Sequence, residues 1–214
     1  GTPLMKESGT TGDITINSVT IGKGTNSVAG NTVVGESALD ASVSGGNNTA
    51  IGKNALTALT SGTINTAVGA NALLSNTTAS ANTAVGSESL KTNTTGFSNT
   101  AVGDEALKLN QTGDKNTAIG NDALLANTTA DNNTAVGNAA LTANTTGQKN
   151  VAVGSLSLDS NTTGTHNTGV GYNVLGVNTT GTNLVAVGSQ ALDANTTGTH
   201  NIGIGQDALG ANTT

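Results

Sequence analysis

Two histidines and a pair of adjacent carboxylates are the side chains of this sequence best suited to chemistry. His166 and His200 occupy the same position of an internal 17-residue repeat, two repeats apart. Stacked repeats would hold them roughly 10 Å apart, at about 4.7–4.9 Å per strand, which is too far for one metal ion. Asp104 and Glu105 fall at positions that carry charge in other repeats, where no burial would split their pKa values. We therefore expect no metal site and no acid–base pair.

Three further patterns are explained better as parts of the repeat than as ligand-binding or modification sites. Residues 203–208 fit G-x-G-x-x-A, but other repeats place Ala at the first glycine, and no βαβ pattern surrounds the motif. No acidic position recurs in every repeat, as a calcium-binding β-roll requires. Nine Asn-x-Thr triplets in the Asn-Thr-Thr-Gly corner of the repeat match glycosylation acceptors, although turn formation explains them more simply. The sequence thus predicts no catalytic, cofactor or metal residue, and no enzyme.

The composition narrows the possible partners. The 214 residues include one Phe, one Tyr, no Trp and no Cys, so neither a disulfide scaffold nor a thiolate metal site is possible. The net charge is −6, and the seven basic residues are scattered singly. Because nucleic acids and anionic membranes select basic patches, we expect neither as a partner. No segment is long and apolar enough to predict membrane insertion.

The elements that position these residues come from a repeat marked by glycine. A glycine recurs every 17 residues without an insertion or deletion, preceded by Val or Ile and followed four residues later by Leu. We call it the repeat glycine, and its copies are Gly35, Gly52, Gly69, Gly86, Gly103, Gly120, Gly137, Gly154, Gly171, Gly188 and Gly205. A fixed short period is typical of stacked repeats, in which each coil contacts only its neighbours.

The repeat reads N-T-A-V-G-x-x-A-L-x-x-N-T-T-G-x-x and predicts a mainly β, parallel β-solenoid or β-roll of eleven coils. N-T-A-V-G predicts a short strand, and G-x-x-A-L predicts a tight or helical turn. The turn glycines of the central coils are Gly69, Gly86, Gly103, Gly120, Gly137 and Gly154. The position before the repeat glycine is always Val or Ile, and the position four after it is always Leu, so these two positions are the predicted core. In the central coils the predicted core residues are Val68, Leu73, Val85, Leu90, Val102, Leu107, Ile119, Leu124, Val136, Leu141, Val153 and Leu158.

Alanine alternates with that predicted core along the strand. Successive strand residues point to opposite faces, so this column is expected to face away from Val. It carries no charge, and a stripe of small apolar residues allows identical chains to approach closely. We therefore predict an inter-chain stripe in a homotrimer, formed by Ala67, Ala84, Ala101, Ala118, Ala135 and Ala152.

Charge and corner residues complete the repeat. From Glu36 onward, every charged residue lies one, two, five, eleven or twelve positions after a repeat glycine, which marks these positions as exposed. The Asn-Thr-Thr-Gly corner is expected to use glycine for a positive φ, and its asparagines are expected to form an amide ladder between coils. Residues 1–30 lie outside the period and predict a cap or lead-in to the solenoid of residues 31–214, with one or two strands within 13–22.

Repeats such as Asn133-Thr134-Ala135-Val136-Gly137, followed by Ala140-Leu141 and Asn144-Thr145-Thr146-Gly147, resemble arrays in bacteriophage tail-fibre proteins. The strand is also similar, more weakly, to the N-S-V-A-I-G repeat of trimeric autotransporter adhesin heads. The tail-fibre resemblance covers about residues 31–214. It implies a homotrimeric fibre that is virion-borne or extracellular, with the host cell-surface receptor bound by other segments.

Two functions of different classes follow. The first is a structural shaft of a tail fibre or surface adhesin, a rigid spacer that presents a receptor-binding region. The alternative is an ice-binding solenoid that uses arrays of Thr hydroxyls. A flat ice-binding face needs Thr alternating along a strand, whereas the paired Thr residues of this repeat lie in the glycine corner.

Overall fold

The protein is described by a computed structural model that covers residues 6–7 and 12–214. It contains fourteen short strands in one sheet, in chain order, and one 3-10 turn, η1 (Thr25–Ser27). The strands are β1 (Lys6–Glu7), β2 (Ile14–Ile16), β3 (Val19–Gly22), β4 (Thr32–Gly35), β5 (Thr49–Ile51), β6 (Thr66–Val68), β7 (Thr83–Val85), β8 (Thr100–Val102), β9 (Thr117–Ile119), β10 (Thr134–Val136), β11 (Val151–Val153), β12 (Thr168–Val170), β13 (Val185–Val187) and β14 (Ile202–Ile204).

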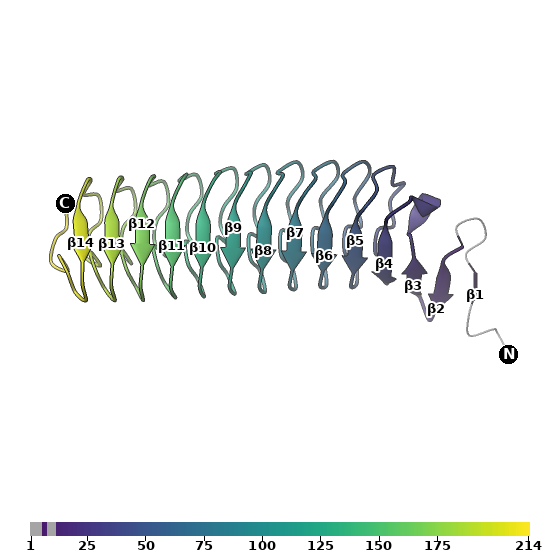
Figure 1. The fold of residues 1–214 in the computed structure, drawn as a ribbon, viewed down its shortest axis with the longest axis horizontal. Coiled ribbons are helices and arrows are strands. Elements are labelled where there is room, and N and C mark those ends of the chain that lie inside the picture. The colour runs from purple at the N-terminus through teal and green to yellow at the C-terminus, as the bar shows by residue number, and fades with distance from the viewer. Residues whose placement is uncertain (1–5, 8–11) are drawn as a thin grey trace.

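Strands β4 to β14 are parallel and stack in one row, so each 17-residue repeat forms one coil of a solenoid (Figure 1). The register never shifts: Thr66 lies beside Thr83, and Ala67 lies beside Ala84. The backbone links neighbouring coils at both strand ends, where Thr66 N donates to Asn82 O at 2.8 Å. The predicted fold class is confirmed.

Antiparallel strands cover the first coil. β2 and β3 form a hairpin, and β3 pairs antiparallel with β4, so the predicted strands within 13–22 are present. Buried Asp13 anchors the next turn, because its carboxylate accepts the backbone N–H groups of Lys23 and Gly24, each at 2.8 Å.

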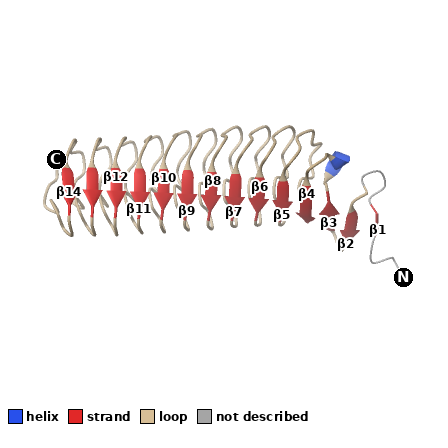
Figure 2. Ribbon diagram, viewed as in Figure 1, coloured by secondary structure: helices blue, strands red, loops and turns tan. Residues whose placement is uncertain are grey.

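The half-coil opposite each strand consists of tight turns (Figure 2). In the β7 coil, three overlapping turns run from Gly86 to Asn93, each closed by an N–H that bonds the carbonyl three residues earlier. Glu88 and Leu90 have φ of 57° and 49°, so positive φ alternates with negative φ and no helix can form. Leu90 N also donates to Ala106 O of the next coil at 3.0 Å. The turn is therefore tight, and this side of the coil is hydrogen-bonded to its neighbours as well.

The repeat glycine is required for two reasons. Gly103 has a φ of 139°, which L-residues rarely adopt. A Cβ at Gly103 would also lie 2.4 Å from the carbonyl oxygen of Gly120 in the next coil. The corner glycine differs from the prediction, because Gly113 does not have a positive φ. Its role is close approach, since a Cβ there would lie 2.4 Å from Ala130 O.

The core is built from Leu and Ala, and the predicted orientation of the strand is wrong. The predicted core leucines are fully buried, as expected. The predicted core Val and Ile face outward instead: Val68, Val85, Val102 and Val136 are half-buried, while Ile119 and Val153 are 41% and 37% exposed. The predicted inter-chain alanines are all 0% exposed and lie inside the coil, at Ala67, Ala84, Ala101, Ala118, Ala135 and Ala152.

The narrowness of the coil explains this inversion. In the β6 coil, Ala67 of the strand shares the interior with Ala72 and Leu73 of the facing turn, all of them 0% exposed. Leu fills the width, so the strand can place only a methyl group inward. The β-branched residues lie on the outer face, where they satisfy strand propensity and pack against the same residue of adjacent coils.

Two columns of buried asparagine hold the coils in register. The predicted corner column forms the amide ladder: Asn110 Nδ2 donates to Asn93 Oδ1, and Asn127 Nδ2 donates to Asn110 Oδ1, each at 2.8 Å. The second column, which precedes β4 to β14 except at Leu184, goes beyond the prediction. There Asn99 Oδ1 accepts the backbone N–H of Asn116 at 2.9 Å. These buried amides are satisfied only when neighbouring coils have the same length.

Candidate interaction face

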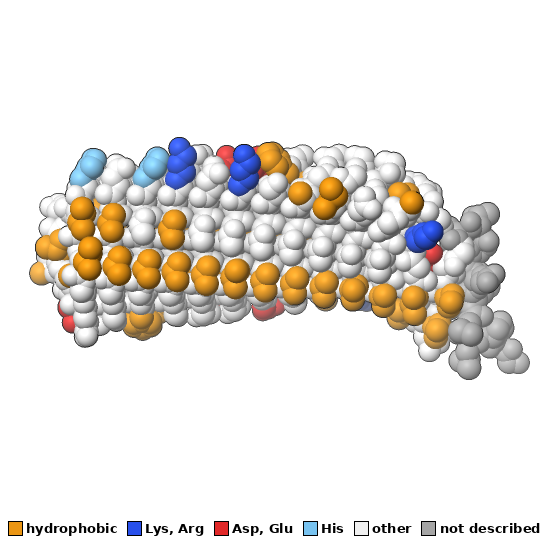
Figure 3. Space-filling model, in the orientation of Figure 1, with side chains coloured by type: hydrophobic (Ala, Val, Ile, Leu, Met, Phe, Trp, Pro, Cys, Tyr) orange, Lys and Arg blue, Asp and Glu red, His pale blue; other side chains and the backbone are white. Residues whose placement is uncertain are grey.

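One surface runs the whole length of the solenoid. The outward Val and Ile side chains of β4 to β14 form an uninterrupted line, which we call the aliphatic stripe (Figure 3). Its members are Val34, Ile51, Val68, Val85, Val102, Ile119, Val136, Val153, Val170, Val187 and Ile204. Contiguous apolar surface of this kind marks interaction sites on soluble proteins.

Threonine flanks the aliphatic stripe on the same strand face. Two residues before each stripe residue stands a Thr, except where Val151, Val185 and Ile202 replace it. Successive residues of this face thus alternate between a hydroxyl-bearing and an aliphatic β-branched side chain. No charged residue lies on it between β4 and β14. The face can therefore offer methyl groups and hydroxyls in a regular array, but no acid, base or nucleophile with a partner.

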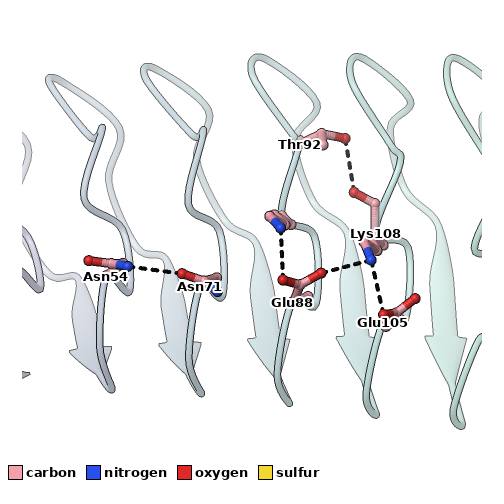
Figure 4. Close-up of polar contacts among 7 residues, drawn as sticks. Asn54, Asn71, Glu88, Thr92, Glu105 and Lys108 are labelled. Carbon is pink, nitrogen blue, oxygen red and sulfur yellow. Dashed lines mark hydrogen bonds and ion pairs between the residues drawn. The ribbon is translucent and has the colours of Figure 1, made fainter.

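The strongest electrostatic interactions lie on the turn side of the coil (Figure 4). Lys108 Nζ lies 2.7 Å from Glu88 Oε2 and 2.9 Å from Glu105 Oε1, and Lys91 Nζ lies 2.7 Å from Glu88 Oε1. Hydrogen bonds from Lys108 and Lys91 lower the pKa of Glu88 to about 2. Hydrogen bonds to Glu88 and Glu105 raise the pKa of Lys108 to about 12. This cluster joins adjacent coils, so its role is structural.

Other polar contacts on the same side also join coils. Asn54 Nδ2 donates to Asn71 Oδ1 at 3.0 Å, and Thr92 Oγ1 donates to the carbonyl oxygen of Lys108 at 2.9 Å (Figure 4). Each bond links a coil to the next one along the chain. These contacts therefore support the stacking of the coils.

Asp159 is the exception among the carboxylates. Its Oδ1 is buried and has no hydrogen-bond partner among the described residues. Burial raises the pKa of the Asp159 carboxyl, and hydrogen bonds with Ser160 oppose this effect only in part. An isolated carboxylate in this position lacks the second group that acid–base chemistry needs.

The residues first considered for chemistry stay apart. His166 and His200 are both exposed, and His166 Nδ1 lies 3.2 Å from Oγ1 of the neighbouring Thr165. Glu105 is engaged by Lys108, whereas Asp104 is exposed beside it. Within residues 12–214, no group of three His, Cys, Asp or Glu side chains could hold a metal ion.

The remaining motifs are parts of the coil. Residues 203–208 run from β14 into a tight turn, where a dinucleotide-binding loop would need a helix. The corner asparagines of the Asn-x-Thr triplets are fully buried from Asn76 to Asn195, with their amides inside the ladder. They are therefore inaccessible to glycosylation in the folded coil.

Two features of this site escaped the sequence reasoning. The aliphatic stripe was assigned to the core, and the Asn column before the strand was not assigned a role. The signal for the stripe was size, because the column that is Ala or Gly in most repeats is the one with least space. The Val or Ile column, although invariant in residue type, was not the buried column of the strand. The signal for the Asn column was the recurrence of Asn four residues before the repeat glycine, where only Leu184 replaces it.

No helix in the described part of the chain is long and apolar enough to cross a membrane. Comparison with protein-family models, with curated proteins and with solved structures found no match.

Proposed function

We propose that this chain is the shaft of a fibre, a rigid spacer that presents a receptor-binding region held elsewhere in the protein. One observation carries the proposal, namely the unbroken register of eleven parallel strands. Each coil is bonded to the next through the strand and the turns, and the two asparagine columns add further bonds along most of the solenoid. Bending the solenoid would have to break several of these sets of inter-coil hydrogen bonds together. A structure of this kind suits a mechanical role and no reaction.

The proposed location and assembly of the fibre rest on the sequence of the repeat. The N-T-A-V-G-x-x-A-L-x-x-N-T-T-G units resemble those of bacteriophage tail fibres, so we propose a homotrimer in a virion tail fibre or on a cell surface. The host receptor would be bound by other segments of the fibre. The aliphatic stripe supports assembly, because it leaves apolar surface uncovered in the isolated chain.

Electron microscopy of negatively stained protein tests the proposed shaft. We expect straight, unbranched rods of one length, since ten intervals at about 4.7–4.9 Å give roughly 48 Å for the eleven parallel coils. Rods that bend freely, or compact particles, would contradict the spacer role.

A second candidate is an ice-binding face, and one observation favours it. The structure places Thr in alternation with Val or Ile on the outer strand face, as in Thr117 and Ile119, which is the arrangement a flat array requires. Assembly of the fibre and ice binding would both use the outer strand face, so this face cannot serve both functions at once. Thermal hysteresis of the purified protein separates them, because a fibre shaft should produce none.

A further inference from the structure

We propose that the aliphatic stripe is covered by further copies of this chain, which lie parallel and in the same coil register. This inference rests on the proposed fibre shaft and names the surface through which its chains associate. It also replaces the alanine stripe, which cannot contact a partner because it is buried inside the coil.

The first argument is the continuity of the stripe. Every coil from β4 to β14 contributes one outward Val or Ile, and no charge interrupts the line. Interior members remain substantially exposed, with Ile119 at 41% and Val170 at 38%. Because the spacing of the stripe equals the coil spacing, a second stripe matches it along its whole length only when the two solenoid axes run side by side.

The second argument is the charge on the two borders of this strand face. One border lies five and six residues before the repeat glycine. Its exposed titratable members, five residues before the glycine, are Lys115, Lys149, His166 and His200. Asp114 and Asp131, six residues before it, are half-buried and accept backbone N–H groups of the preceding coil. The other border lies one and two residues after the repeat glycine, and its charged members are Glu36, Lys53, Glu88, Asp104, Glu105, Asp122 and Asp207. Glu36 pairs with Lys53 at 3.2 Å, and Glu88 and Glu105 pair with Lys91 and Lys108. The carboxylates of this border without an ion pair among the described residues are Asp104, Asp122 and Asp207. The exposed basic side chains of the first border, the basic border, therefore face unpaired carboxylates on the second, the acidic border.

These borders select the relative direction of the chains. Rotation about an axis parallel to the solenoid keeps the chains parallel and brings the basic border of one copy against the acidic border of the next. Rotation about an axis perpendicular to the solenoid and lying in the plane of the face makes the chains antiparallel and brings like borders together. Like charges across an interface disfavour the second arrangement. Charge complementarity thus favours parallel copies, as in a cyclic trimer.

The positions of individual charges select the register. Lys115 and Asp122 belong to the β9 coil, and His200 and Asp207 belong to the β14 coil. Copies in the same register place each of these pairs at one level, on facing borders. Within the single chain, Lys115 lies over the Phe97 ring, and neither Lys115 nor Asp122 forms an ion pair among the described residues. Contact between chains would provide these partners.

The apolar part is tested with I119T/V136T/V153T, in which three stripe residues become the β-branched residue that already flanks them. We expect light scattering to give a multiple of 20.7 kDa for the wild type, three for the trimer, and a smaller mass for the variant at micromolar concentration. Unchanged circular dichroism would show that the coils remain intact. A variant that keeps the wild-type mass would overturn the interface.

Charge reversal tests the direction and register. K115E should weaken association by about tenfold or more, because two carboxylates then face each other, and K115E/D122K should restore it to within about threefold of the wild type. K115Q controls for the lost Phe97 contact. K149E is the matched control, since Ser155 and Leu156 on the acidic border of the same coil carry no charge. Failure of the double variant to recover would overturn the parallel, in-register arrangement.

The interface and the proposed shaft can fail separately. A wild-type monomer in solution would overturn the interface, yet straight rods in the microscope would still support a spacer. Flexible or compact particles would overturn the shaft, whatever their mass.

Discussion

Gly169 in β12 faces Val174 across the interior of one coil, and each stands where most coils have alanine. A Cβ placed on Gly169 would lie 3.0 Å from Val174 Cγ1, 3.0 Å from Ser157 Oγ and 3.2 Å from Leu158 Cδ1. The glycine thus leaves room for a larger residue opposite, and Val174 is 0% exposed. The interior keeps its volume although both residues differ from the consensus.

This compensation predicts coupling between the two positions. G169A alone should destabilise the protein by about 1–3 kcal/mol through overpacking. G169A/V174A restores the consensus pair and should recover most of that loss, so denaturant unfolding of the four proteins gives a non-zero coupling energy. Additive effects of the two changes would contradict a shared space.

The corner amide ladder should be costly to interrupt. Asn127 Nδ2 donates to Asn110 Oδ1 at 2.8 Å and to Ala130 O at 3.1 Å, and the side chain is fully buried. N127A leaves Asn110 Oδ1 without its donor and removes the acceptor of Asn144 Nδ2, whereas Ala130 O keeps its bond from Asn116 Nδ2. We expect a loss of about 2–4 kcal/mol in thermal or denaturant unfolding. N138A is the surface control, because Asn138 is exposed, and it should cost less than about 0.5 kcal/mol.

The fixed period predicts that deletions are tolerated only in whole repeats. Removing residues 121–137 deletes 17 residues and joins two equivalent positions, so every ladder can re-form. Removing residues 121–136 deletes 16 residues and displaces the buried amides, which should cost about 3 kcal/mol or more as several polar groups lose their partners. Circular dichroism and thermal unfolding compare the two, and equal stability would contradict a register held by the asparagines.

The ion pairs of Glu88 and Lys108 predict that the folded protein loses stability at both acidic and alkaline pH. The pKa of Glu88 falls from 4.5 to about 2, so its contribution is complete above pH 4.5 and is lost as the pH falls towards 2. The pKa of Lys108 rises from 10.5 to about 12, so its contribution is complete below pH 10.5 and is lost as the pH rises towards 12. E88Q should flatten the acid limb of a pH–stability curve. The effect should stay below about 1 kcal/mol, because solvent reaches these side chains.

Asp159 predicts the opposite dependence in the acid range. Its pKa is raised in the folded protein, so the folded state binds more protons there, and stability falls as the pH rises above the ordinary value of 3.8. D159N removes the charge that burial penalises and should stabilise the protein at pH 7. Melting temperatures at pH 3 and pH 7 test this, since the gain should be present at pH 7 and absent at pH 3.

The sequence by itself determined the repeat, the parallel solenoid and the corner ladder. An invariant 17-residue spacing leaves stacking in register as the arrangement that aligns every Leu and every corner Asn. It also identified the turn that carries Ala72 and Leu73 inward, because that segment has no strand alternation and its neighbours carry charge.

Only the tertiary structure decided which strand face points inward. Alternation separates Ala67 from Val68, but it does not say which of the two is inside. The answer depends on the width of the closed coil, which is set by the facing turn, where Ala72 and Leu73 already fill the space. The short strand residue therefore lies within, and the β-branched residue forms the outer surface.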